Sequence, residues 1–197
     1  TLLAHNSTLY RVTDAGVGST VLSGLSTNQI HFSFDRDLVT VWDGVNRPKT
    51  STDGSTWQNF GIDPPATPPT ASTLSSGVVS SGEYAIAYSY KDRSLSYESN
   101  ISSGSTVTLS GSTGALHASA TASTEAHVDA FVWYAKDITA GETVYRKVSS
   151  GAASTVRITS TDWTANAEAP TNHDVLAKAR FGAVWKNRWW VIDPDVP

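Results

Sequence analysis

Cysteine is absent from the 197 residues, so the chain can form neither a disulfide framework nor a thiolate metal site. This absence fits synthesis in a reducing compartment and does not exclude later release from the cell. Methionine is absent as well, the initiator included, and both ends of the chain lie beside strand-like sequence. We therefore expect the chain to be a fragment of a longer protein.

Charge is also scarce, because only 16% of the residues are charged and the net charge is -4. No basic run exceeds two residues, which argues against direct readout of nucleic acid. No apolar stretch approaches the length of about 18 residues that spans a membrane, and no signal peptide is visible. Nucleic acid and membrane are therefore not expected as partners.

Helix-forming Glu, Lys and Gln are few, whereas Ser and Thr are abundant, so the composition predicts an all-β fold with many turns. Residues 30–34 alternate between apolar and polar, and residues 38–42 form a strand-like run before Asp43-Gly44, a preferred hairpin turn. Residues 84–90 place three tyrosines and an isoleucine on one face. We expect that tyrosine face to form a core rather than a binding surface.

Four prolines between residues 64 and 69 mark a domain boundary, because proline cannot lie in a sheet interior. We predict a proline-rich linker at residues 63–70 and a sandwich at 71–172. About seven short strands match the size of an immunoglobulin or fibronectin type III sandwich, and the lack of a cysteine pair favours the fibronectin variety. Residues 1–62 and 173–197 are predicted to form antiparallel, propeller-like hairpins into which the sandwich is inserted.

The sequence offers little that indicates catalysis. Residues 51–57, Ser-Thr-Asp-Gly-Ser-Thr-Trp, are one residue short of the Asp-box turn of sialidase-like propellers, and such turns are structural. The five histidines are scattered, and neither a Gly-x-Ser-x-Gly elbow nor a phosphate-binding loop occurs. We predict a non-enzymatic protein without catalytic, cofactor-binding or metal-binding residues.

Two pairs of aspartates, Asp35 with Asp37 and Asp193 with Asp195, are weak candidates for Ca²⁺ ligands. Turn aspartates that bond their own backbone are the simpler interpretation. Asn6 and Asn100 begin glycosylation acceptor patterns, but no secretory signal supports their use.

Seven tryptophans are many for this length, and a sugar-binding platform is one interpretation of them. Most lie in strand-like segments, where burial is the default. Trp189 and Trp190 are adjacent, so they point to opposite faces of a strand and one of them is expected to meet solvent or a partner. We predict this pair as a contact surface.

Several short motifs follow one another along most of the chain in a specific order, and together they resemble phage and prophage virion proteins of the tail hub and nozzle type. The matching segments are residues 43–49 (Asp-Gly-Val-Asn-Arg-Pro-Lys), 53–57 (Asp-Gly-Ser-Thr-Trp), 61–65 (Gly-Ile-Asp-Pro-Pro), 82–90, 98–100 (Glu-Ser-Asn), 180–185 and 187–191. The chain departs from the resemblance in one respect, because 197 residues are too few for a whole propeller with an insert.

The resemblance implies a structural virion protein that contacts other virion proteins and copies of itself in a homo-oligomeric ring, with a hexamer as the implied number. It also implies synthesis in the host cytoplasm and localisation in the virion. Two alternatives remain open: a carbohydrate-binding module, with a glycan as partner, and a fragment of a sialidase-like enzyme.

Overall fold

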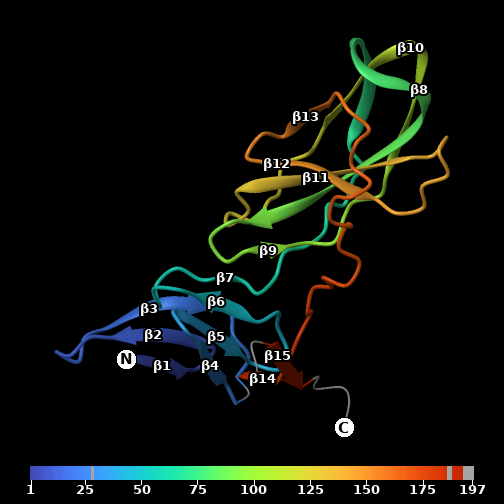
Figure 1. The fold of residues 1–197 in the computed structure, drawn as a ribbon. Helices are drawn as coiled ribbons and strands as arrows, with labels where there is room; N and C mark the ends of the chain where they lie inside the picture. The colour runs from blue at the N-terminus through green and yellow to red at the C-terminus, as the bar shows by residue number, and fades with distance from the viewer. Residues whose placement is uncertain (28, 186–187, 193–197) are drawn as a thin grey trace. The chain divides into compact units, whose positions relative to one another are not determined.

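A computed structural model describes residues 1–27, 29–185 and 188–192, except that the side chains of 185, 188 and 189 are not described. The described residues form antiparallel strands and no helix, so the all-β prediction is confirmed. The chain divides into two compact units (Figure 1). Unit 1 comprises Thr1–Phe60 with Val175–Pro197, and unit 2 comprises Gly61–Asp174. These boundaries lie close to residues 62 and 172, where the sequence places them.

The first sheet of unit 1 has three strands in the order β1-β2-β3. Asn6 and Ser7 join β1 to β2 with φ angles of 44° and 61°, the left-handed conformation that a two-residue hairpin turn requires. Leu9 of β2 is fully buried. The three strands are β1 (Leu2–His5), β2 (Thr8–Val12) and β3 (Gly18–Ser23).

The second sheet is a four-stranded meander in the order β4-β5-β6-β7. All five residues of β5 are buried, because other sheets cover both of its faces. Val41 packs with Leu9 and Leu25 in one core, and Trp42 points to the opposite face. The strands are β4 (His31–Asp35), β5 (Leu38–Trp42), β6 (Lys49–Ser51) and β7 (Gln58–Asn59).

A third sheet, β14 (Phe181–Trp185) with β15 (Arg188–Ile192), covers the Trp42 face of the second. Gly182 lies against the indole of Trp42, where an added Cβ would stand 2.2 Å from a ring carbon. The rings of His31 and Phe181 meet edge to face with centroids 5.7 Å apart. Unit 1 thus consists of three antiparallel sheets packed in chain order. The sequence of unit 2 is inserted between the second sheet and the third.

Unit 2 contains one six-stranded sheet, ordered β12-β11-β8-β10-β13, with β9 paired to β8. Residues 105–119 form one continuous strand, β10, and β8 extends through the serine-rich residues 70–83. The strands are β8 (Thr70–Asp92), β9 (Tyr97–Glu98), β10 (Ser105–Ser119), β11 (Ala130–Asp137), β12 (Arg146–Gly151) and β13 (Thr155–Ile158).

This long sheet curls around a single core because its two longest strands change register between their halves. Tyr84, Tyr88 and Tyr90 lie in that core together with Trp133 of β11, which confirms the tyrosine face as core. Ile62 and Trp163, from outside the sheet, complete the cluster.

The proline-rich segment is part of unit 2 rather than a free spacer. Pro65 and Pro69 are buried, and the backbone N–H of Asp63 donates to Glu125 Oε2 at 3.3 Å. Strand β8 begins at Thr70, directly after the last proline. The rigidity of proline therefore fixes how the chain enters the sheet.

Candidate functional site: an aromatic cleft in unit 1

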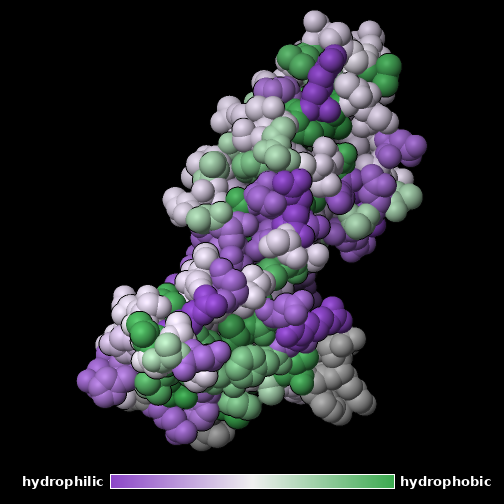
Figure 2. Space-filling model, turned by 90° about the vertical axis from the view of Figure 1, so that its left-hand side faces the viewer, coloured by the Kyte–Doolittle hydropathy of each residue, from purple (hydrophilic) through white to green (hydrophobic). Residues whose placement is uncertain are grey.

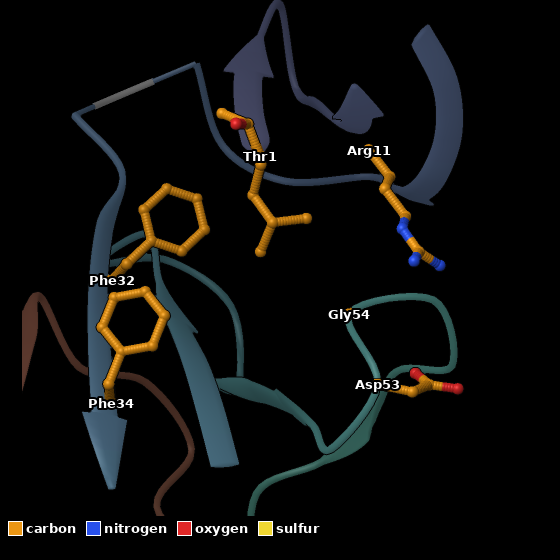
Figure 3. A pocket seen from close by; sticks show the side chains of 7 residues that line it. Thr1, Arg11, Phe32, Phe34, Asp53 and Gly54 are labelled. Carbon is orange, nitrogen blue, oxygen red and sulfur yellow. The ribbon is translucent and has the colours of Figure 1, made fainter. Parts of the chain in front are cut away.

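A cleft of about 430 Å³ opens on unit 1 between the first two sheets (Figure 3). Strands β1 and β2 contribute one side, β4 contributes the second, and the turn before β7 closes the third. The lining residues are Thr1, Leu2, Arg11, Phe32, Phe34, Asp53 and Gly54. Its volume is within the range of small-molecule and peptide side-chain pockets.

Phe32 and Phe34 form the aromatic wall of the cleft. They are two residues apart on β4, so the period of the strand puts both rings on the same face, where Figure 3 shows them one beside the other. Phe32 packs partly into the core of unit 1, whereas Phe34 is 71% exposed. An exposed phenylalanine beside a cleft is a ready contact for an apolar ligand.

Arg11 supplies the cationic rim. Its Nη1 donates to Ser55 Oγ at 2.6 Å, so a residue of β2 is tied to the turn that follows β6. This contact fixes one end of the guanidinium, and the side chain is otherwise exposed. Arginine carries five N–H donors in a planar fork, which suits recognition of a carboxylate.

Asp53 belongs to the turn more than to the cleft. Its carboxylate accepts hydrogen bonds from the backbone N–H groups of Thr56 and Ser55, both at 2.7 Å, and from the Ser51 hydroxyl at 3.0 Å. These bonds hold the pKa of Asp53 well below its usual range, with the Thr56 N–H contributing most. In Figure 3 the carboxylate points away from the cavity. Asp53 therefore closes a turn, as Asp-box-like sequences do.

Asp43 organises a second turn of unit 1. It is buried, which by itself would raise the pKa of its carboxyl. Backbone N–H groups of Asn46, Ser26 and Val45 donate to the carboxylate at 2.8 to 3.0 Å, and together they lower that pKa below its ordinary value. The Asp43 carboxylate thus joins the loop before β4 to the turn after β5.

A partly buried polar cluster in unit 2 centres on Glu98. Its Oε1 accepts hydrogen bonds from the hydroxyls of Ser89 and Tyr134, and its backbone oxygen lies 2.8 Å from His173 Nδ1. Burial raises the pKa of Tyr134, and the bond to Glu98 raises it further, so the phenol stays protonated as a donor. The cluster satisfies buried polar groups and offers no activated nucleophile.

Metal-binding and triad-like arrangements are not found in the part of the chain that the structure describes. No group of three or more His, Asp or Glu side chains lies close enough there to hold a metal ion, Asp35 and Asp37 included. Asp193 and Asp195 lie outside the described residues. Within the described ranges, none of the five histidines hydrogen-bonds a serine hydroxyl. The described residues also contain no helix that could cross a membrane.

The predicted contact pair lies on β15. Trp190 pairs with Ala183 of β14 and is 56% exposed, whereas the side chain of Trp189 lies outside the described part of the structure. Figure 2 shows apolar surface, in green, between hydrophilic residues on unit 1. The large apolar side chains exposed on that unit are Leu3, Val17, Phe34, Val45, Phe181, Trp190, Val191 and Ile192.

The aromatic cleft itself is not predicted from the sequence. The alternation at residues 30–34 indicates a strand but not which face remains open. Arg11 and Ser55 are 44 positions apart, so no local pattern indicates their contact. No family model, no curated protein and no solved structure matches this chain.

Proposed function

We propose that this chain is a non-enzymatic structural component of a bacteriophage virion, of the tail, neck, nozzle or hub type. It acts through protein–protein contacts in a ring of copies. The observation that carries the proposal is the interrupted stack of sheets in unit 1, in which the chain leaves after β7 and returns as β14 against β4 and β5. Such an arrangement of body and insert is what the ordered motifs lead us to expect.

The meander β4 to β7 supports a propeller-like body. A propeller blade is a four-stranded antiparallel sheet whose two faces pack against neighbouring blades. Here the Val41 face packs against the first sheet, and the Trp42 face packs against Gly182 of the third. Two of the motif turns, at Asp43 and Asp53, connect the strands of this one sheet.

For unit 2 we propose a fibronectin III-like character. Both halves of β8 and of β10 contribute residues to one core, and the facing sheets of a sandwich share one core in the same way. Val79 comes from the first half of β8, and Tyr88 from the second. The halves remain joined by continuous strands, so the arrangement is a curled relative of that sandwich type.

A ring requires two different contact patches on each copy, since head-to-tail contacts close into rings when the rotation permits. Trp190 and Ile192 are exposed and lie two residues apart on β15, so they share one face and provide one apolar patch. The aromatic cleft provides a second one on the same unit. The low charge of the chain suits wide, polar interfaces around such anchors.

The test is to look for the protein in virions and to determine its assembly. We expect mass spectrometry to find the protein in purified particles and immunogold labelling to place it on the tail or neck. Mass photometry of the full-length protein at high concentration is expected to show ring-sized species. A protein that is absent from virions and strictly monomeric contradicts the proposal.

A carbohydrate-binding module is the second candidate, and the exposed aromatic rings of Phe34 and Trp190 favour it. A glycan array comparing the unmodified chain with Phe34→Ala, Trp189→Ala and Trp190→Ala separates the two functions. Loss of a specific glycan signal in one variant supports the module. Absence of a specific glycan signal from the unmodified chain argues against it. Val17→Ala, in which an exposed residue away from the cleft is changed, is the control that should bind like the unmodified chain.

A further inference from the structure

The charge balance of the aromatic cleft indicates the kind of ligand that it accepts. Among the described residues, Asp53 is the only acidic one that lines the cleft, and its oxygens already receive the turn's hydrogen bonds. Thr56 donates its hydroxyl to the second oxygen at 3.2 Å. Little acceptor capacity is left there for sugar hydroxyls, although the carboxylate keeps its negative charge. Because that carboxylate points away from the cavity (Figure 3), the side-chain charge left for a ligand in the cleft is the guanidinium of Arg11.

Arg11 is held in place by one hydrogen bond and still has N–H donors that a ligand can use. Its one hydrogen bond within the described residues uses Nη1, toward Ser55 Oγ, and leaves the Nε–H and the Nη2 hydrogens. The tie to Ser55 reduces the conformational freedom that a ligand would otherwise have to remove. A carboxylate is the group that matches the remaining fork, since it accepts two parallel N–H bonds from an arginine.

Apart from Thr1 and Gly54, the remaining lining side chains are apolar. Leu2, Phe32 and Phe34 line the cleft, and Phe34 is the most exposed large apolar side chain among those described in unit 1. The ligand must therefore carry a bulky apolar group next to its negative charge. When a ligand covers Phe34, aromatic surface is removed from water, and this contributes favourably to the free energy of binding.

Strand β4 also favours an extended peptide over a small molecule. It stands at the edge of its sheet, where β5 is its only ladder partner within the described residues. The backbone N–H and C=O groups of an edge strand can pair with an added strand, whose alternate side chains then enter neighbouring pockets.

We propose that this cleft binds an extended segment of a neighbouring subunit in which a large apolar side chain is followed closely by a carboxylate. The apolar side chain packs on Phe32 and Phe34, and the carboxylate bonds the guanidinium of Arg11. This inference rests on the proposed function in taking the ligand to be a protein segment.

The test uses the whole chain, labelled with ¹⁵N, and two blocked peptides that differ in one group. Acetyl-Phe-Leu-Asp-amide carries the carboxylate, and acetyl-Phe-Leu-Asn-amide is its neutral isostere. We expect the acidic peptide to shift the NMR signals of residues 32–34 and 53–54 and the Nε–H signal of Arg11. Its affinity should exceed that of the neutral peptide by about tenfold at low salt, and the difference should shrink at about 1 M salt.

Two variants and one control determine where the peptide binds. Arg11→Gln and Phe34→Ser should each weaken binding of the acidic peptide by about tenfold. Val17→Ser removes a side chain that is 65% exposed and lies outside the cleft, so binding should not change. Arg11 and Phe34 are exposed, so both variants should fold, which their NMR spectra will show.

Equal affinity for the two peptides overturns the inference, as does unchanged binding in either cleft variant or no shift at millimolar peptide. Binding of a neutral oligosaccharide at the same residues, without peptide binding, overturns it as well. If the protein is found in virions but its cleft binds no acidic peptide, this inference is contradicted and the proposed function is not. If the cleft binds the peptide but the protein is absent from virions, the proposed function is contradicted and the peptide site is not.

Discussion

Aspartates at the ends of strands, or just after them, hold the turns of this protein in place. Asp92 Oδ1 accepts the backbone N–H groups of Ser94 and Leu95, and Asp137 Oδ1 accepts that of Ala140. Asp43 and Asp53 do the same in unit 1 with more donors each. A short side chain that bonds the backbone two or three residues later stabilises a turn without help from distant parts of the chain. These four residues therefore serve the fold.

Replacing Asp43 with asparagine should destabilise unit 1 at neutral pH. Asparagine has one acceptor oxygen where aspartate has two, so at least one partly buried N–H loses its acceptor, at a cost of about 1–3 kcal/mol. The folded pKa of Asp43 is lowered, so its contribution is complete above the unfolded value of about 3.9 and is lost as the pH falls through the folded pKa. The difference in free energy of unfolding between the variant and the unmodified chain, measured by urea unfolding, should therefore be larger at pH 7 than at pH 3.

Asp14→Asn is the matched control for this prediction, because Asp14 is exposed in the turn between β2 and β3. It should leave the free energy of unfolding within about 0.5 kcal/mol of the unmodified chain at both pH values. If Asp43→Asn behaves like this control, the Asp43 carboxylate does not hold the two loops together.

At the scale of elements, close backbone contacts between β8 and β10 shape unit 2. The ladder between these strands changes register on both sides of Gly114, and four residues of β8, 75–78, have no partner in it. A Cβ added to Gly114 would lie 2.5 Å from the carbonyl oxygen of Leu74 and 2.7 Å from a methyl carbon of Leu109. Only glycine fits there, because the two strands approach each other more closely than side chains permit.

Gly114→Ala should lower the free energy of unfolding of unit 2 by about 1–3 kcal/mol, because the backbone or Leu109 must move to accept the methyl group. Gly151→Ala is the matched control, since Gly151 lies in β12 of the same sheet with nothing within 4 Å of the added carbon. Its effect should remain within about 0.5 kcal/mol. Denaturant unfolding followed by tryptophan fluorescence measures both variants. Equal effects of the two substitutions would show that the close approach is not tight in solution.

At the scale of the whole molecule, the two units have separate cores. The core of unit 1 gathers Leu9, Leu25 and Val41, whereas that of unit 2 gathers residues between Ile62 and Trp163. Unit 2 is continuous in sequence, but unit 1 is assembled from two stretches of chain. A continuous segment with its own core is expected to fold independently.

An excised segment of residues 61–174 should therefore fold on its own and unfold in one cooperative transition. Circular dichroism should show strand structure, and the fluorescence of the buried Trp133 and Trp163 should change at the same denaturant concentration. A shorter segment that ends at residue 158 lacks Trp163 and should be markedly less stable. A disordered 61–174 segment would contradict the independence of unit 2.

The sequence by itself determined the strand type, the tyrosine core of β8 and the aspartate turns. Each depends on side-chain period or on bonds within a few residues. Only the tertiary structure decided that residues 105–119 form one strand and that 70–83 belong to β8. It also decided that Phe34 meets solvent beside Arg11. These features depend on pairing between residues far apart in the chain, and a single alternating strand cannot show which of its faces a distant sheet will cover.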